Sequence, residues 1–225
     1  MADTERAVRI YKTAVSKDKA LGAIAKNPRG WDDAYRYAKG VGTAVGKAVF
    51  GDLEADDFAD VLDVVMRAGF DDVTKLCRKV QRFLLDDSGL GLGILTPEYP
   101  VGIASEIALL MSDAGEAGID YLTNMVSKEV LGAVDESIRQ NSEAAVNMGL
   151  ECKITRRYDD VGVHDGKDPC QWCLDREGTW NNYEEALADG AFQRHPGCGC
   201  VITYEVKKTR TWSNTAGKWN NLDEL

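Results

Sequence analysis

Apolar residues recur at helical spacing through most of the first 149 residues. The clearest stretch is Glu54–Ala68, and a second begins at Asp71–Asp72 and stops before Gly89. Because side chains three and four positions apart share one face of a helix, each stretch predicts an amphipathic helix. With Gly69 as a stop between them, they predict an antiparallel helical hairpin. The two stripes contain Phe58, Val61, Leu62, Val65 and Met66, then Val73, Leu76, Cys77, Val80, Phe83 and Leu84.

A third clear helix is predicted at Lys128–Met148, with Gly149 as its stop. Weaker helical patterns cover Thr4–Lys26, Trp31–Phe50 and Ile103–Met125. Gly42 and Gly46 lie four residues apart in the second of these. That spacing indicates either a close approach by another helix, including one from another chain, or a poorly formed helix.

The segment Gly89–Gly102 interrupts the helical pattern with glycines, apolar residues and two prolines. We interpret it as a loop packed on the core. The alternative is a docking loop for a partner, because exposed apolar patches usually mark contacts. Cys77 lies within an apolar stripe, which indicates a buried core cysteine rather than a reactive thiol.

The pattern changes near Leu150. Strands are predicted at Cys152–Tyr158 and Cys200–Val206, and Asn182 is expected to cap a short helix through Leu187. Cys152 should pack inward, and Asp159–Asp168 has the composition of a turn. The expected fold class is α+β: a helical region at residues 1–149, a small α+β module at 150–206 and a polar tail at 207–225.

The formal net charge is −10, and charged residues make up 28% of the chain. Such a surface repels phosphates, which argues against wrapping DNA and leaves only a local basic patch open. The sequence shows neither a secretory signal nor an apolar stretch long enough to span a bilayer, so we expect no membrane association. A reducing compartment is then expected, in which closely spaced cysteines favour metal over disulfides.

Five residues able to bind a metal lie within thirty-one positions: Cys170, Cys173, His195, Cys198 and Cys200. The sequence reads Pro169-Cys-Gln-Trp-Cys173, then 21 residues, then His195-Pro-Gly-Cys-Gly-Cys200. Two short turns of this kind can grip opposite sides of a tetrahedral ion, so the pattern predicts one structural Zn²⁺. Four ligands close such a site and leave no position for a reacting water.

The fourth ligand is not decided by spacing. His195 and Cys198 match the two-residue gap of the first pair, and Cys200 competes with His195 for the last position. Gly197 and Gly199 should let the backbone turn around the ion. We expect polar contacts to the ligands from Asp175, Arg176 or Gln193.

Catalytic zinc chemistry fits the sequence poorly. Zinc deaminases need His-x-Glu before Pro-Cys-x-x-Cys, whereas the upstream histidine here reads His164-Asp-Gly and stands close to the cysteines. No His-Glu-x-x-His of a metalloprotease occurs. We interpret His164 as a solvated turn residue rather than a nuclease base. A redox Cys-x-x-Cys would need a βαβ context, which the pattern lacks.

The ending Cys-x-x-Cys then His-Pro-Gly-Cys-Gly-Cys, leading into a strand, resembles the minor capsid proteins of tailed phages. These are the head-morphogenesis proteins related to the F protein of phage Mu, in which a helical region precedes a small domain ending in His-Pro-x-Cys-Arg-Cys. Gly199 stands where arginine is usual. The run Arg156-Arg157-Tyr158-Asp159-Asp160 is similar to the family's entry strand. The resemblance covers about residues 150–206.

The resemblance implies a structural virion protein without catalytic activity, assembled in the host cytoplasm and present in few copies inside the phage head near the portal. Its expected partners are portal or major capsid subunits, with self-assembly left open and no sequence-specific nucleic acid binding. One alternative is a metal-dependent nuclease or hydrolase acting on phage DNA. A second is a zinc-finger adaptor, although residues 151–225 carry 10 basic and 13 acidic side chains, a net charge of −3.

Overall fold

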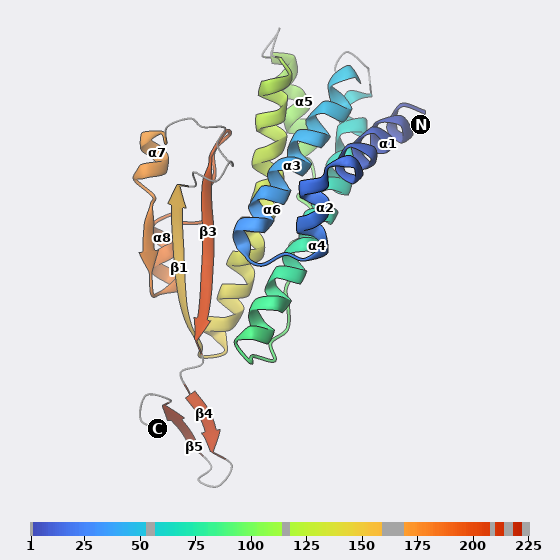
Figure 1. Cartoon of the computed structure of the whole chain (residues 1–225). Helices are drawn as coiled ribbons and strands as arrows, with labels where there is room; N and C mark the ends of the chain where they lie inside the picture. The colour runs from blue at the N-terminus through green and yellow to red at the C-terminus, as the bar shows by residue number, and fades with distance from the viewer. Residues whose placement is uncertain are drawn as a thin grey trace.

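The computed structural model describes residues 2–52, 57–113, 118–158, 169–207, 210–213 and 218–221. Its α-helices are α1 (Ala2–Lys17), α2 (Lys19–Lys26), α3 (Trp31–Val49), α4 (Phe58–Asp87), α5 (Ile103–Asp113), α6 (Ile119–Asn147), α7 (Gln171–Leu174) and α8 (Tyr183–Ala188), with a 3-10 turn at Phe50–Asp52. Its strands are β1 (Glu151–Tyr158), β2 (Gly178–Trp180), β3 (Cys200–Lys207), β4 (Arg210–Ser213) and β5 (Lys218–Asn221). The expected α+β class is confirmed: helices form the N-terminal region, and a small antiparallel sheet follows (Figure 1).

Helices α3 and α6 pack at very short range through the two glycines of α3. A Cβ atom added to Gly42 would lie 2.8 Å from the Cα of Ser127, and one on Gly46 would lie 3.1 Å from the Cα of Thr123. Only glycine allows backbones to approach this closely. The spacing therefore marks a close helix contact, and that contact lies within the chain.

The expected hairpin at residues 54–88 is wrong, because α4 is one helix of 30 residues that runs through Gly69. A Cβ atom on Gly69 would lie 2.9 Å from Val45 Cγ2 and 3.1 Å from Val41 Cγ1 on α3. The glycine therefore makes room for α3 and does not end the helix. The apolar stripes before and after it also lie on one continuous face, which stabilises the helix across the glycine by tertiary packing.

Two other expected boundaries need correction. The segment Thr4–Lys26 is divided into α1 and α2 at Asp18, whose side chain accepts hydrogen bonds from the backbone N–H groups of Ala20 and Leu21. Helix α5 ends at Asp113 and α6 begins at Ile119 and continues through 125–128, so the expected boundary between the later helices is wrong. The helix α6 begins after Gly118 and ends before Gly149, whose φ of +79° suits a helix stop.

The segment Gly89–Gly102 packs on the helices, as expected. Leu90 and Pro97 are buried. The side chain of Asn141 on α6 accepts from the backbone N–H of Leu95 at 2.9 Å and donates to its carbonyl at 2.9 Å. These two hydrogen bonds hold the extended backbone of the segment against α6. Tyr99 also packs edge-on against Phe70 of α4, at a centroid distance of 5.5 Å.

The sheet has the strand order β2-β1-β3, and both pairings are antiparallel. Its long pair runs from Glu151 opposite Lys207 to Tyr158 opposite Cys200. Figure 1 shows β1 and β3 beside α6, with α7 and α8 next to the sheet. Buried residues of the sheet, including Ile154 and Ile202, belong to the same apolar core as the helices.

The short helix α8 begins after Asn182, whose side chain accepts from the Glu184 N–H at 2.8 Å, as expected for a cap. Strand β2 and the hairpin of β4 with β5 were not anticipated from the sequence. Trp212 and Trp219 are paired positions in that hairpin. In the part of the chain that is described, no helix combines the length and apolar character needed to cross a membrane.

Candidate metal centre

The first arm of the site is a single tight turn that carries Cys170 and Cys173. The backbone N–H of Cys173 donates to the carbonyl of Cys170 at 2.9 Å. Cys170 stands at the N-cap position of α7, and Cys173 lies inside that helix. A turn of this type brings the two sulfurs to the same side of the backbone, which is the arrangement that a pair of metal ligands requires.

The second arm repeats this geometry at His195 and Cys198. The Cys198 N–H donates to the carbonyl of His195 at 3.1 Å, and Gly197 takes the left-handed conformation with φ of +74°. A side chain at position 197 would be strained in that conformation. Cys200 follows as the first residue of β3. The expected second turn is thus present, and Gly197 is the glycine that permits it.

All five candidate ligands come together between these two arms. The ligand atoms fall into two groups of three, within 4.8 Å of one another: Cys170, Cys173 and His195, and then Cys173, Cys198 and Cys200. Cys173 belongs to both groups. Its sulfur lies 3.8 Å from that of Cys198, which matches the about 3.8 Å between two sulfurs bound to one tetrahedral zinc at about 2.3 Å each.

The ring of His195 is oriented as a metal ligand would be. Its Nδ1 lies 2.7 Å from the carbonyl oxygen of Pro196, and because a carbonyl oxygen only accepts, Nδ1 carries the proton. The lone pair is then on Nε2, which lies 3.3 Å from Cys170 Sγ and 3.1 Å from Cys173 Sγ. A backbone carbonyl that fixes the tautomer in this way is common for metal-bound histidines.

Burial and charge give the sulfurs different acidities. The pKa of Cys198 falls to about 5, because the Cys200 thiol donates a hydrogen bond to it and the guanidinium groups of Arg194 and Arg156 lie nearby. Burial and the neighbouring Cys198 sulfur raise the pKa of Cys173 to about 12. Cys173, Cys198 and Cys200 are all nearly inaccessible to solvent, with exposures of 1%, 3% and 0%. A cation placed among them would compensate the charge that burial disfavours.

Arg156 supports the second arm from inside the sheet. Its side chain is 1% exposed, donates to the carbonyls of Ala191 and Gln193 at 2.8 and 2.5 Å, and lies 3.6 Å from Cys198 Sγ. Trp172 lies within cation–π distance of this guanidinium, 5.2 Å from its ring centroid. The arginine therefore ties the backbone before His195 to the sulfur after it.

Arg194 joins the metal centre to the helical bundle. Its guanidinium donates to the carbonyls of Cys198 and Cys200 at 3.0 and 2.9 Å. It also pairs with Asp135 of α6 through bonds of 2.7 and 3.0 Å, and both side chains are 4% exposed. Tyr35 of α3 donates to the same carboxylate at 2.5 Å. Two bundle helices thus reach the turn that carries His195 and Cys198 through one buried ion pair.

The sequence pointed to other polar neighbours. Gln193 accepts a hydrogen bond from Arg156 through its backbone carbonyl, Arg176 stacks on Trp172 at 4.0 Å, and Asp175 accepts from Gln171 at 2.6 Å. None of these contacts reaches a sulfur. The sequence does indicate that Arg156 is buried, because strand alternation places it on the same inward side of β1 as Cys152 and Ile154. His164 and the rest of Asp159–Asp168 lie outside the described residues.

The remaining two cysteines, Cys77 and Cys152, are buried, as predicted from the sequence. Cys77 is 2% exposed in α4, and Cys152 is 2% exposed with its sulfur 3.6 Å from the carbonyl of Ser142. All six cysteines are free thiols. Comparison with known protein families, characterised proteins and solved structures yields no match for this chain.

Proposed function

We propose that the chain is a structural protein of a phage head, a minor capsid protein that assembles with portal or major capsid subunits and is braced by one zinc ion. The observation that carries the proposal is the convergence of Cys170, Cys173, His195, Cys198 and Cys200 between two matching turns. The same five residues carry the resemblance to the head-morphogenesis proteins. The order of a helical region followed by a small sheet also supports it.

The donor set favours zinc. Thiolates and a neutral imidazole are soft or borderline ligands, and tetrahedral sulfur–nitrogen sites are typical of structural zinc. Five donors compete for four positions, so protein atoms suffice to fill the coordination sphere without water. This supports a bracing role over the alternative of a metal-dependent nuclease or hydrolase, which needs an open position on the ion.

The site would brace the module by fixing two chain segments that are distant in sequence. When an ion links α7 to the turn before β3, the ends of β1 and β3 at Tyr158 and Cys200 are held beside it. Structural zinc in small modules supplies on the order of 10 kcal/mol, because the site forms together with the fold. The helices would then present a fixed surface to capsid or portal subunits.

The metal assignment is tested with Cys173→Ala, because Cys173 belongs to both groups of ligands. We expect about one zinc per chain in the parental protein and less than about one fifth of that in the variant, measured by elemental analysis after dialysis. Cys152→Ala is the matched control, since it removes a buried thiol outside the cluster. Full zinc retention in Cys173→Ala would refute the site.

The fourth ligand is identified by replacing zinc with cobalt(II) and recording absorption spectra of His195→Ala and Cys200→Ala. We expect His195 to be the ligand, because Nε2 faces two sulfurs. His195→Ala should then change the cobalt spectrum strongly, whereas Cys200→Ala should keep a three-sulfur spectrum. The reverse result would assign four thiolates.

The role in the virion requires a separate measurement. Quantitative mass spectrometry of purified heads from a phage that encodes this chain should detect it at a few copies per portal. Its absence from heads would contradict the proposal. Metal-dependent cleavage of DNA by the purified protein, abolished by EDTA, would support the nuclease instead.

A further inference from the structure

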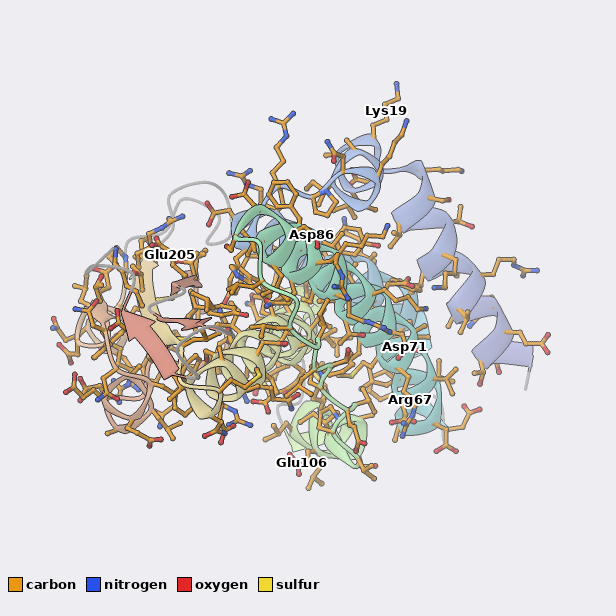
Figure 2. The ribbon with its side chains drawn as sticks, turned by 90° about the horizontal axis from the view of Figure 1, so that it is seen from below. Lys19, Arg67, Asp71, Asp86, Glu106 and Glu205 are labelled. Atoms are coloured by element: carbon orange, nitrogen blue, oxygen red, sulfur yellow. The ribbon has the colours of Figure 1, made fainter. Side chains whose placement is uncertain are left out.

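A groove of about 770 Å³ lies between the C-terminal end of α2 and the C-terminal half of α4. Its charged lining is mostly basic, although the chain as a whole has a net charge of −10. The acidic member is Asp86, toward the end of α4 (Figure 2). The basic members are Lys26, Lys75, Arg78, Lys79 and Arg82.

Four of these basic residues form a stripe on α4. They lie at positions 75, 78, 79 and 82, a spacing that places them on one face over about 10 Å. Lys79 also donates to the carbonyl of Ala25 at 2.8 Å, which holds the end of α2 against α4. Arg78 and Arg82 are exposed and form no ion pair with any residue in the described ranges. Their guanidinium groups are therefore open to an anion from outside the chain.

An exposed aromatic ring borders the same groove. The apolar pattern of α4 places Phe83 on the inward stripe, but its side chain is 47% exposed and lines the groove. Exposing a phenyl ring is unfavourable unless something covers it. A flat ring beside guanidinium groups is the combination with which proteins hold single-stranded nucleic acids: cations contact phosphates, and the ring stacks on a base.

We propose that this groove binds a short stretch of single-stranded nucleic acid without sequence preference. Arg78 and Arg82 contact phosphate oxygens through their forked donors, Lys26 adds charge from the opposite wall, and Phe83 stacks on a base. The acidic remainder of the surface confines the contact to this groove and makes the affinity fall steeply with salt. This inference stands apart from the metal centre and from the proposed role in the virion.

The test uses the full chain and a fluorescein-labelled oligothymidylate of about twelve nucleotides, followed by anisotropy from about 25 to 200 mM NaCl. Three or four phosphate contacts predict a slope of log affinity against log salt of about −2 to −3. Arg78→Gln/Arg82→Gln should weaken binding at least about 10-fold and make the slope shallower by about 1.4, about 0.7 for each lost phosphate contact. Phe83→Ala should weaken it about 10-fold and leave the slope unchanged.

The matched control is Arg9→Gln/Lys153→Gln, which removes the same charge from exposed positions on α1 and β1. Its affinity should stay within about twofold of the parental chain. Equal weakening by both double variants, or no binding at the lowest salt, overturns the proposal. So does polyglutamate that displaces the oligonucleotide at equal charge concentration, or a duplex that binds more tightly than the single strand. Thermal melts of each variant check that it is folded.

Discussion

The six free cysteines fall into two chemical groups that are set by their immediate neighbours. Cys198 lies beside two guanidinium groups and a donating thiol, which lower its pKa to about 5. Cys77 and Cys152 instead lie in the apolar core, where burial raises their pKa values to about 12 and about 11. The first environment favours a thiolate that binds a cation, and the second favours a neutral thiol that behaves as a small apolar side chain.

This difference predicts how stability changes in alkaline solution. In the unfolded chain a cysteine ionises above about pH 8.5, but folded Cys77 stays protonated until much higher pH. The unfolded state therefore binds fewer protons in this window, and stability falls by up to about 1.4 kcal/mol per pH unit. From pH 8.5 to 10, the free energy of unfolding of Cys77→Ala should fall by about 1.6 kcal/mol less than that of the parental chain.

The measurement is urea unfolding under reducing conditions at several pH values. Cys77→Ala also leaves a small cavity, so its stability should be lower by a constant amount at neutral pH. Only the pH dependence tests the burial of the thiol. Stability curves that run parallel for the two proteins from pH 8.5 to 10 would contradict it.

At the scale of elements, the contact between α3 and α6 depends on the glycines of α3. Gly42→Ala places a Cβ atom 2.5 Å from Ser127 Oγ and 2.8 Å from its Cα, and a backbone atom cannot move aside without shifting the helix. We expect a loss of about 1–3 kcal/mol in the free energy of unfolding from this overpacking. It should outweigh the gain of about 1 kcal/mol from alanine's helix propensity.

Gly132→Ala is the matched control, because Gly132 lies in α6 and an added Cβ atom meets nothing within 4 Å. This variant should be more stable by up to about 1 kcal/mol. Thermal and chemical unfolding of both variants give the comparison. Stabilisation by both substitutions would mean that α3 and α6 do not approach each other as closely as the short distances at Gly42 require.

At the scale of the whole molecule, the pair of Asp135 and Arg194 connects the bundle to the candidate metal centre. Removing one partner leaves the other as a buried, unpaired charge, so Asp135→Leu and Arg194→Met should each destabilise the protein by about 3–5 kcal/mol. The double variant has no unpaired buried charge. Its loss in the free energy of unfolding should therefore be smaller than the sum of the two single losses by at least about 2 kcal/mol.

The two single variants should differ in their effect on zinc retention. Arg194→Met also frees the carbonyls of Cys198 and Cys200, so we expect it to weaken zinc retention against a competing chelator. Asp135→Leu touches the metal-binding turn only through the arginine, and its effect on zinc should be smaller. Strictly additive stability losses would show that the two side chains do not act as a pair.

The sequence alone determined the spacing of the five metal-competent residues, the helical character of residues 1–149, and the strands that contain Cys152 and Cys200. These features are local, because periodicity, caps and turns depend on neighbours within a few positions. Tertiary structure decided the rest. Gly69 lies inside a helix because α3 packs directly against it. Phe83 is exposed because the face of α4 that packs against the core does not include it. The side chain of Arg194 is buried because it forms an ion pair with Asp135, which lies 59 residues away in the sequence. A sequence pattern specifies which face of an element is apolar, but only packing between distant segments specifies what that face meets.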